Sequence, residues 1–270
     1  MRVLIINTSE KTGGAAVASN RLMEALNNSG VKAKMLVRDK TSANITVVGL
    51  HGRLRQQWNF LWERLHIYLC LHLHKNHLFE IDTADTGTDI TKLQEFKEAD
   101  IIHLEWINQG MLSLKNIQKI ISSCKPVIWT MHDLWPAASI CHYANGCENF
   151  KDHCHNCPLL PDEGSPKDLS YKIWEKKKKT YGTNNIHFVT CSHWLEEQAK
   201  QSSLLRGQHV TCIPNPIDTQ VFKKKDKSLS RKNAGLPNDK KIILFVSQRV
   251  TDKRKGMEYF IDAVKKLTCE

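Results

Sequence analysis

Two cations follow an apolar segment near the carboxyl end of the chain. Residues 241–247 read Lys-Ile-Ile-Leu-Phe-Val-Ser, which is typical of a buried strand. The loop after this segment carries Arg249 and Lys255, and Gly256 precedes a stretch at 257–267 with helical periodicity. Cations after a strand and free backbone N–H groups at the start of a helix are the groups that bind phosphate. The pattern predicts a binding site for a phosphorylated ligand.

A pair of glycines lies near the start of the chain. Gly13 and Gly14 separate an apolar run at 3–7, expected to be a strand, from a helix expected at about 15–28. Without side chains a ligand can approach the backbone there, and the helix start favours a phosphate or a sugar hydroxyl. An ordinary tight turn explains the pair equally simply. The complete glycine fingerprint of dinucleotide-binding proteins is missing, so NAD binding is not predicted.

A histidine and an aspartate follow another apolar run. His132 and Asp133 come directly after 127–131, Val-Ile-Trp-Thr-Met. The carboxyl ends of strands are where open α/β sheets collect their ligands. His132 is therefore predicted to contact a ligand, with a structural histidine as the alternative. Asp133 has no assigned role, and helix capping is its simplest explanation.

Four cysteines lie within 17 residues after this position. Cys141, Cys147, Cys154 and Cys157 end in a Cys-x-x-Cys pair, and four thiolates can hold zinc tetrahedrally at about 2.3 Å. We expect a structural zinc site, because four cysteines leave no open position for catalysis. A redox pair at Cys154 and Cys157 and a set of two disulfides are the alternatives.

Apolar runs and helical stretches alternate along the chain. This order predicts an α/β fold with a mostly parallel sheet and helices on both faces. Further strands are expected at 33–37, 45–50, 101–106, 187–191 and 210–213, and further helices at 112–122 and 194–203.

One long helix is expected at 53–77. Its apolar stripe is bordered by Arg53, Arg55, Arg64, Lys75 and several histidines. The stripe either packs against the sheet or lies on an anionic membrane surface. It consists of Leu54, Trp58, Leu61, Leu65 and Leu69.

The formal charge of the chain is +11, and the basic surplus is concentrated at one end. Residues Arg206 to Glu270 hold 15 Lys/Arg against 7 Asp/Glu, which suggests an anionic partner. The first residues lack the apolar core of a secretory signal, and no window approaches the ~20 apolar residues of a spanning helix. We therefore expect a cytoplasmic protein whose nine cysteines are thiols or metal ligands.

Two features together resemble a known family. Ile-Pro-Asn-Pro-Ile-Asp at 213–218, and Arg249 with Lys255 and Gly256, are similar to motifs of the family 4 glycosyltransferases of the GT-B fold. The resemblance implies a Rossmann-like acceptor-side domain at 1–215 with the Cys-rich insert at 141–157. It also implies a linker at 216–240 and, at 241–270, the first βα unit of a truncated nucleotide-sugar domain.

The resemblance also implies roles for the singled-out residues. Gly13, Gly14, Arg249 and Lys255 would bind the donor's diphosphate, and His132 would contact the transferred sugar. The Cys-rich insert after His-Asp-Leu-Trp resembles a bacterial subgroup that builds surface polysaccharides, of the colanic-acid type.

The implied reaction transfers a sugar from a nucleotide diphosphate sugar to a glycan or lipid-linked acceptor, with retention at the anomeric carbon. No cofactor beyond the donor is implied for catalysis, and this chain by itself would have incomplete activity. The implied location is cytoplasmic, at the inner face of the plasma membrane. Two other functions remain open: an epimerase acting on nucleotide sugars, and a zinc-containing module that binds nucleic acid. The second is disfavoured because the basic segments lack regularly spaced aromatic residues for base stacking.

Overall fold

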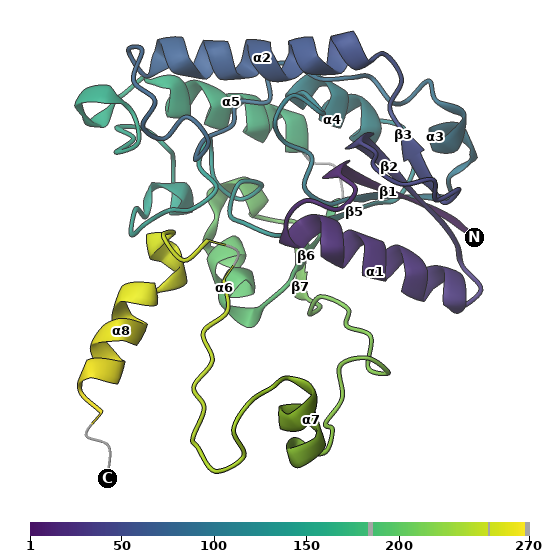
Figure 1. Cartoon of the computed structure of the whole chain (residues 1–270). Helices are drawn as coiled ribbons and strands as arrows, with labels where there is room; N and C mark the ends of the chain where they lie inside the picture. Colours follow the sequence, from purple (N-terminus) through teal and green to yellow (C-terminus); the bar gives the residue numbers. More distant parts are fainter. Residues whose placement is uncertain (183–185, 248, 268–270) are drawn as a thin grey trace. The chain divides into compact units, whose positions relative to one another are not determined.

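The structure is a computed structural model of the chain that describes residues 1–182, 186–247 and 249–267 (Figure 1). It divides into two compact units, Met1–Asp218 and Thr219–Glu270. The first unit holds the sheet and is described first.

The first unit is built on a parallel sheet of seven strands. Their order across the sheet is β3-β2-β1-β4-β5-β6-β7, and every pairing is parallel. This confirms the predicted α/β fold with a parallel sheet. The strands are β1 (Arg2–Ser9), β2 (Lys32–Asp39), β3 (Val47–Gly49), β4 (Ile101–Leu104), β5 (Val127–Met131), β6 (Ile186–Thr190) and β7 (His209–Cys212).

Helices lie on both faces of this sheet, in unequal numbers. Helix α1 (Gly14–Asn28) packs Met23 against β1 and β2 on one face. The opposite face carries the larger core, to which α4, α5 and α6 contribute (Figure 1). The remaining helices of this unit are α2 (Arg53–Cys70), α3 (Gln94–Glu98), α4 (Leu114–Ile121), α5 (Leu169–Tyr181) and α6 (His193–Gln201).

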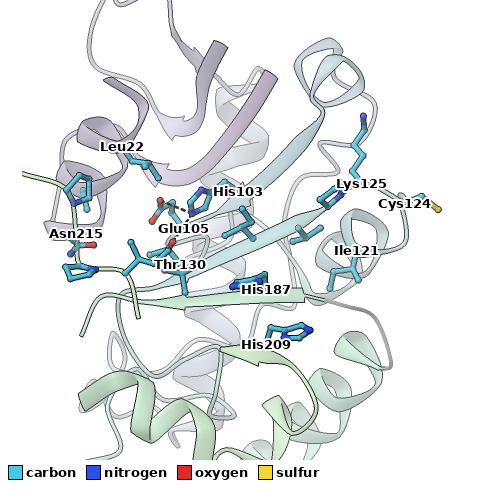
Figure 2. A pocket seen from close by; sticks show the side chains of 18 residues that line it. Leu22, His103, Glu105, Ile121, Cys124, Lys125, Thr130, His187, His209 and Asn215 are labelled. Atoms are coloured by element: carbon cyan, nitrogen blue, oxygen red, sulfur yellow. Dashed lines mark hydrogen bonds and ion pairs between the residues drawn. The ribbon is translucent and has the colours of Figure 1, made fainter. Parts of the chain in front are cut away.

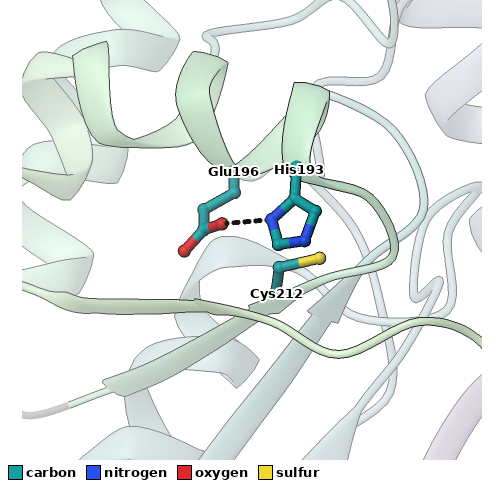
Figure 3. Close-up of side chains that lie close together, drawn as sticks. All are labelled: His193, Glu196 and Cys212. Atoms are coloured by element: carbon teal, nitrogen blue, oxygen red, sulfur yellow. Dashed lines mark hydrogen bonds and ion pairs between the residues drawn. The ribbon is translucent and has the colours of Figure 1, made fainter.

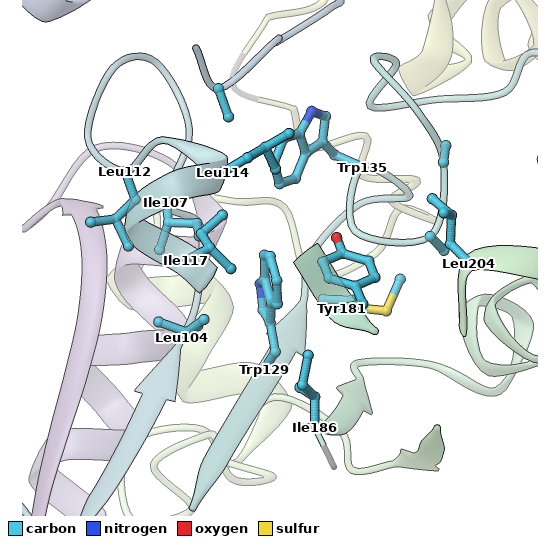
Figure 4. Close-up of a cluster of buried hydrophobic side chains, with 14 of the residues drawn as sticks. Leu104, Ile107, Leu112, Leu114, Ile117, Trp129, Trp135, Tyr181, Ile186 and Leu204 are labelled. Atoms are coloured by element: carbon cyan, nitrogen blue, oxygen red, sulfur yellow. The ribbon is translucent and has the colours of Figure 1, made fainter. Parts of the chain in front are cut away.

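Alternate residues of β5 show how the two faces differ. Val127, Trp129 and Met131 enter the larger core, where Trp129 lies close to the rings of Tyr181 and Phe188 (Figure 4). Ile128 and Thr130 point to the face that α1 covers only in part, and there they line a cavity. Because successive side chains of a strand alternate between faces, the core on one side fixes which residues the other side presents.

The long helix predicted at 53–77 is shorter than expected. Helix α2 ends at Cys70, and both His72 (φ 52°) and Leu73 (φ 66°) adopt left-handed backbone conformations that a helix cannot contain. The apolar stripe does not pack against the sheet, so that interpretation is wrong. All five of its residues are exposed, and the buried side of α2 consists of Gln56, Asn59, Glu63, Arg64 and Ile67.

The second unit contains short helices in its described residues. They are α7 (Lys227–Asn233), a 3₁₀ turn at Lys253–Lys255, and α8 (Met257–Lys265). The strand predicted at 241–247, whose apolar residues are 242–246, is not formed. A strand is stabilised by hydrogen bonds to a neighbouring strand, and the described residues of this unit contain none. Across the part of the chain that the structure describes, no helix is long and apolar enough to span a bilayer.

Candidate functional site

Three loops meet at one edge of the sheet, at the carboxyl ends of β1, β4 and β5. The chain leaves β1 toward β2 on one side, and β4 lies on the other side, so the strand order reverses here. Such a switch point is where open α/β sheets bind ligands. The loops bring Gly13 and Gly14, Glu105, and His132 to this edge.

His132 is paired with a carboxylate. Its Nε2 lies 2.6 Å from Oε2 of Glu105, which is the first residue after β4 and is only 3% exposed. Oε1 of the same carboxylate lies 3.4 Å from Nε2 of His103. Glu105 therefore sits between two imidazole rings and fixes how the His132 ring is turned.

His103 is a buried residue of β4 beside the same carboxylate. Burial lowers its pKa, although the charge of Glu105 acts in the opposite direction. Its Nε2 is also 2.8 Å from Oγ1 of Thr130. The Thr130 hydroxyl is therefore the hydrogen-bond partner of this nitrogen, and the Glu105 carboxylate lies farther away, at 3.4 Å.

A cavity of about 740 Å³ opens on this side of the sheet (Figure 2). Glu105, His103 and Thr130 line it, as do His187 and His209 from β6 and β7 (Figure 2). Apolar walls come from α1 and from the Ile-Pro-Asn-Pro segment at 213–216. Imidazole and hydroxyl groups among apolar walls suit a ligand that has both hydroxyl groups and a hydrophobic face.

The glycine pair lies at the start of α1. Gly13 (φ 91°) is the N-cap residue and Gly14 is the first helical residue. A Cβ atom added at either position would meet nothing within 4 Å. Nearby, Glu10 accepts hydrogen bonds from the backbone of Thr41 and Ser42. Burial raises the pKa of this carboxyl, but these hydrogen bonds outweigh burial and lower it to about 2. The start of α1 is thus open to a ligand.

Asp133 belongs to a buried network, so helix capping was the wrong explanation for it. Its carboxylate accepts hydrogen bonds from Trp106 Nε1 (2.9 Å) and the Trp135 N–H (3.0 Å), and lies 2.7 Å from His142 Nδ1. The other ring nitrogen of His142 lies 2.6 Å from Asp82. Burial lowers the pKa of His142, but the two carboxylates prevail and raise it to about 10. His142 is therefore a buried cation between two carboxylates.

The four cysteines of the insert line one small cavity of about 20 Å³. Burial raises the pKa of Cys154 to about 12 and that of Cys157 to about 11. Redox-active thiols show the opposite shift, so the raised pKa values disfavour the redox interpretation. The eight described cysteines of the chain are free thiols.

A buried lysine lies close to these cysteines. Lys177 is fully buried; it donates hydrogen bonds to the carbonyls of Trp135 (2.5 Å) and Ala138 (2.9 Å). Among the described residues it forms no ion pair with a carboxylate. Burial strongly lowers its pKa, and negative charge on Cys141 or Cys154 would act in the opposite direction.

Another group of possible metal ligands lies elsewhere. Ligand atoms of His193, Glu196 and Cys212 lie within 4.8 Å of one another (Figure 3). Within the described residues the cysteine sulfur atoms of the insert do not form such a group. Glu196 already contacts His193 (3.1 Å) and Lys200 (2.8 Å), so it is accounted for as a surface ion pair. Ser192 caps α6 through the Leu195 N–H (3.3 Å).

Arg249 and Lys255 lie in the second unit. Lys255 ends the 3₁₀ turn that Asp252 caps, and Gly256 (φ 73°) is the N-cap residue of α8. The structure brings His132 and the glycine pair to one edge of the sheet. It does not place the two cations relative to that edge.

Comparisons with known proteins give partial matches. No family model matches the chain. Part of the chain is 30% identical, over 88 residues, to the putative colanic acid biosynthesis glycosyl transferase WcaC of Escherichia coli K12. The match covers 30% of this chain and 22% of that protein, so the chain spans about a fifth of the relative's length. Among solved structures, an α-glucosyltransferase in complex with UDP and DNA is similar over 84% of this chain and 46% of its own. The TM-score is 0.38 and the identity is 12%.

Proposed function

We propose that this chain carries the acceptor-side site of a retaining glycosyltransferase that acts in surface polysaccharide synthesis. The donor is a nucleotide diphosphate sugar, and the acceptor is a hydroxyl of a glycan or a lipid-linked saccharide. The pairing of His132 with Glu105 carries this proposal, because it lies at the switch point of the sheet and beside an open helix start. The partial identity to a glycosyltransferase supports it.

The His132 ring would contact the transferred sugar. Its Nε2 is held by Glu105, and among the described residues no second hydrogen bond to this ring is found. We assign the opposite nitrogen, Nδ1, to a hydroxyl of the sugar. The buried carboxylate of Glu105 also stabilises any positive charge that develops on the ring or on the adjacent sugar.

The start of α1 in the first unit and the two cations of the second unit are each proposed to bind diphosphate. Gly13 and Gly14 offer backbone N–H groups with no side chain in the way, and Arg249 and Lys255 would stabilise the leaving diphosphate. Retention requires no protein nucleophile if the donor phosphate accepts the proton of the attacking hydroxyl on the same face. The cations would take the role that a divalent metal has in other transferases.

We also propose that Cys141, Cys147, Cys154 and Cys157 hold a structural zinc ion. The small cavity that all four cysteines line supports this proposal. The sulfur atoms of these cysteines do not form a group within 4.8 Å of one another. Zinc binding would therefore have to bring the four cysteines closer together.

The function is tested by sugar transfer and by donor binding. Purified chain is titrated with UDP-glucose and GDP-mannose in a calorimeter, and transfer of labelled sugar to bacterial lipid extract is measured. We expect His132→Ala to abolish transfer, and His74→Ala, an exposed histidine beyond α2, to leave it unchanged. Epimerised donor formed without acceptor would instead support an epimerase. Salt-sensitive binding to DNA or RNA without any donor binding would support the nucleic-acid module.

A further inference from the structure

Helix α2 turns its apolar side away from the protein. Two tryptophans of this side, Trp58 and Trp62, stack with ring centroids 5.9 Å apart. A surface helix normally buries its apolar stripe. The exposed face of α2 consists of Leu54, Trp58, Leu61, Trp62, Leu65 and Leu69.

Polar contacts fix α2 in this orientation. Oε1 of Glu63 accepts hydrogen bonds from the backbone N–H groups of Ala84 (2.7 Å) and Thr83 (3.1 Å). Arg64 donates to the carbonyl of Leu78 (2.6 Å) and pairs with Asp82. Rotating the helix to bury its leucines would separate Glu63 and Arg64 from these partners. Buried charges would then be left unpaired, which is strongly unfavourable.

Close backbone packing keeps the helix in place as well. A Cβ atom on Gly110 would lie 2.7 Å from the backbone carbon of Asn59 in α2. Gln56 adds a hydrogen bond of 2.9 Å to the hydroxyl of Thr88. These contacts to α2 therefore hold its apolar face outward. A contiguous exposed apolar patch of this kind marks an interaction surface.

The charged residues around this face indicate which kind of partner it binds. Glu63 is the only carboxylate residue of α2 and it is fully buried, whereas Arg53 and Arg55 are exposed at the start of the helix. Lys75 is exposed beyond its end. Helix α5 lies next to α2 in Figure 1. Its Lys176 lies 3.5 Å from Asp85, and Asp85 also contacts His66 of α2.

We propose that α2 lies in the plane of an anionic lipid bilayer, with its leucines and tryptophans in the acyl boundary and its cations at the headgroups. Tryptophan rings favour this depth, and basic residues at the rim are attracted to anionic lipids. A second copy of the chain fits less well. Antiparallel pairing of two such faces would bring Arg53 and Arg55 of one copy toward Lys75 of the other, and like charges repel. This inference does not depend on sugar transfer.

Vesicle co-sedimentation tests the proposal with the full chain. Vesicles of phosphatidylcholine mixed with phosphatidylglycerol should bind the protein, and vesicles of phosphatidylcholine alone should bind it more weakly. The double variant Trp58→Ser and Leu61→Ser should bind the mixed vesicles at least about tenfold more weakly, because it removes buried apolar area. The matched control is Trp194→Ser, since Trp194 (65%) and Trp58 (64%) are equally exposed, and it should bind like the parent.

Charge reversal separates electrostatic attraction from the apolar contact. Arg53→Glu with Arg55→Glu should abolish the preference for phosphatidylglycerol, and circular dichroism should show unchanged folding. Equal binding of the parent and the Trp58/Leu61 variant, or equal loss with Trp194→Ser, would overturn the proposal. A dimer in light scattering that the Trp58/Leu61 variant dissolves, without vesicle binding by the parent, would also overturn it.

Discussion

Replacing Gly14 with alanine should raise the stability of the protein and lower its affinity for the donor. Gly14 is the first residue of α1 and has no positive φ, and a Cβ there meets no atom within 4 Å. Alanine favours a helix over glycine by up to about 1 kcal/mol. For a unit of this size, each kcal/mol shifts Tm by about 2–4 °C. Gly14→Ala should therefore raise Tm slightly.

The same substitution should weaken donor binding if the space above Gly14 holds a phosphate or sugar. An inserted methyl group in a filled site costs about 1–3 kcal/mol. That corresponds to an affinity roughly 5- to 150-fold lower. Differential scanning fluorimetry gives Tm, and calorimetric titration with UDP-glucose and GDP-mannose gives Kd, on the same preparations.

Gly13→Ala is the matched control, because its neighbourhood is equally open but its φ is 91°. A left-handed alanine costs about 1–3 kcal/mol, so this variant should lose stability where Gly14→Ala gains it. A stable Gly14→Ala protein that binds donor like the parent would refute the idea that the glycine pair receives the ligand. A drop in Tm for Gly14→Ala would refute the conformational reasoning.

Four further outcomes are expected. Glu105→Gln should leave the fold intact and lower transfer by up to about 100-fold, because the His132 ring loses its fixed orientation; steady-state kinetics check this. Gly87→Ala should lower the free energy of unfolding by about 1–3 kcal/mol or more in urea titrations, since its Cβ would lie 2.2 Å from the Ser113 nitrogen. The contribution of His142 to stability should be fully present below pH 6.5 and disappear as pH rises through about 10, and His142→Gln should remove this dependence in urea melts. Zinc measured by mass spectrometry should be lost in Cys154→Ser and kept in Cys124→Ser, whose cysteine is exposed and outside the insert.

The strands of the first unit were predictable because buried parallel strands are continuous apolar runs. The strand expected at 127–131 coincides with β5, so His132 directly follows the carboxyl end of a strand, as predicted. Its partner Glu105 was missed. The strand expected at 101–106 included it, whereas β4 ends at Leu104 and makes Glu105 the first residue beyond the strand. Strand ends depend on pairing with neighbours, which an apolar run does not specify.

Helix α2 shows a different limit of sequence patterns. Its periodicity identified a stripe of leucines and a tryptophan but could not tell which side faces the protein. The inward side is fixed by Glu63 and Arg64, whose partners lie in the loop at 78–84. Those contacts join residues up to 21 positions apart and follow no local period. Hydrophobic patterning therefore predicted a helix that begins at Arg53, placed its end at 77 instead of Cys70, and left its orientation open.

The same buried charges connect the exposed helix to the candidate site. Arg64 of α2 pairs with Asp82, which contacts His142, and His142 contacts Asp133, the residue next to His132. Breaking any of these pairs would leave an uncompensated buried charge, so the four groups behave as one rigid connection. If α2 rests on a bilayer, this connection sets the height and tilt of His132 above it. An acceptor anchored in that bilayer by a lipid would then meet the site at a fixed distance, which free diffusion in water would not provide.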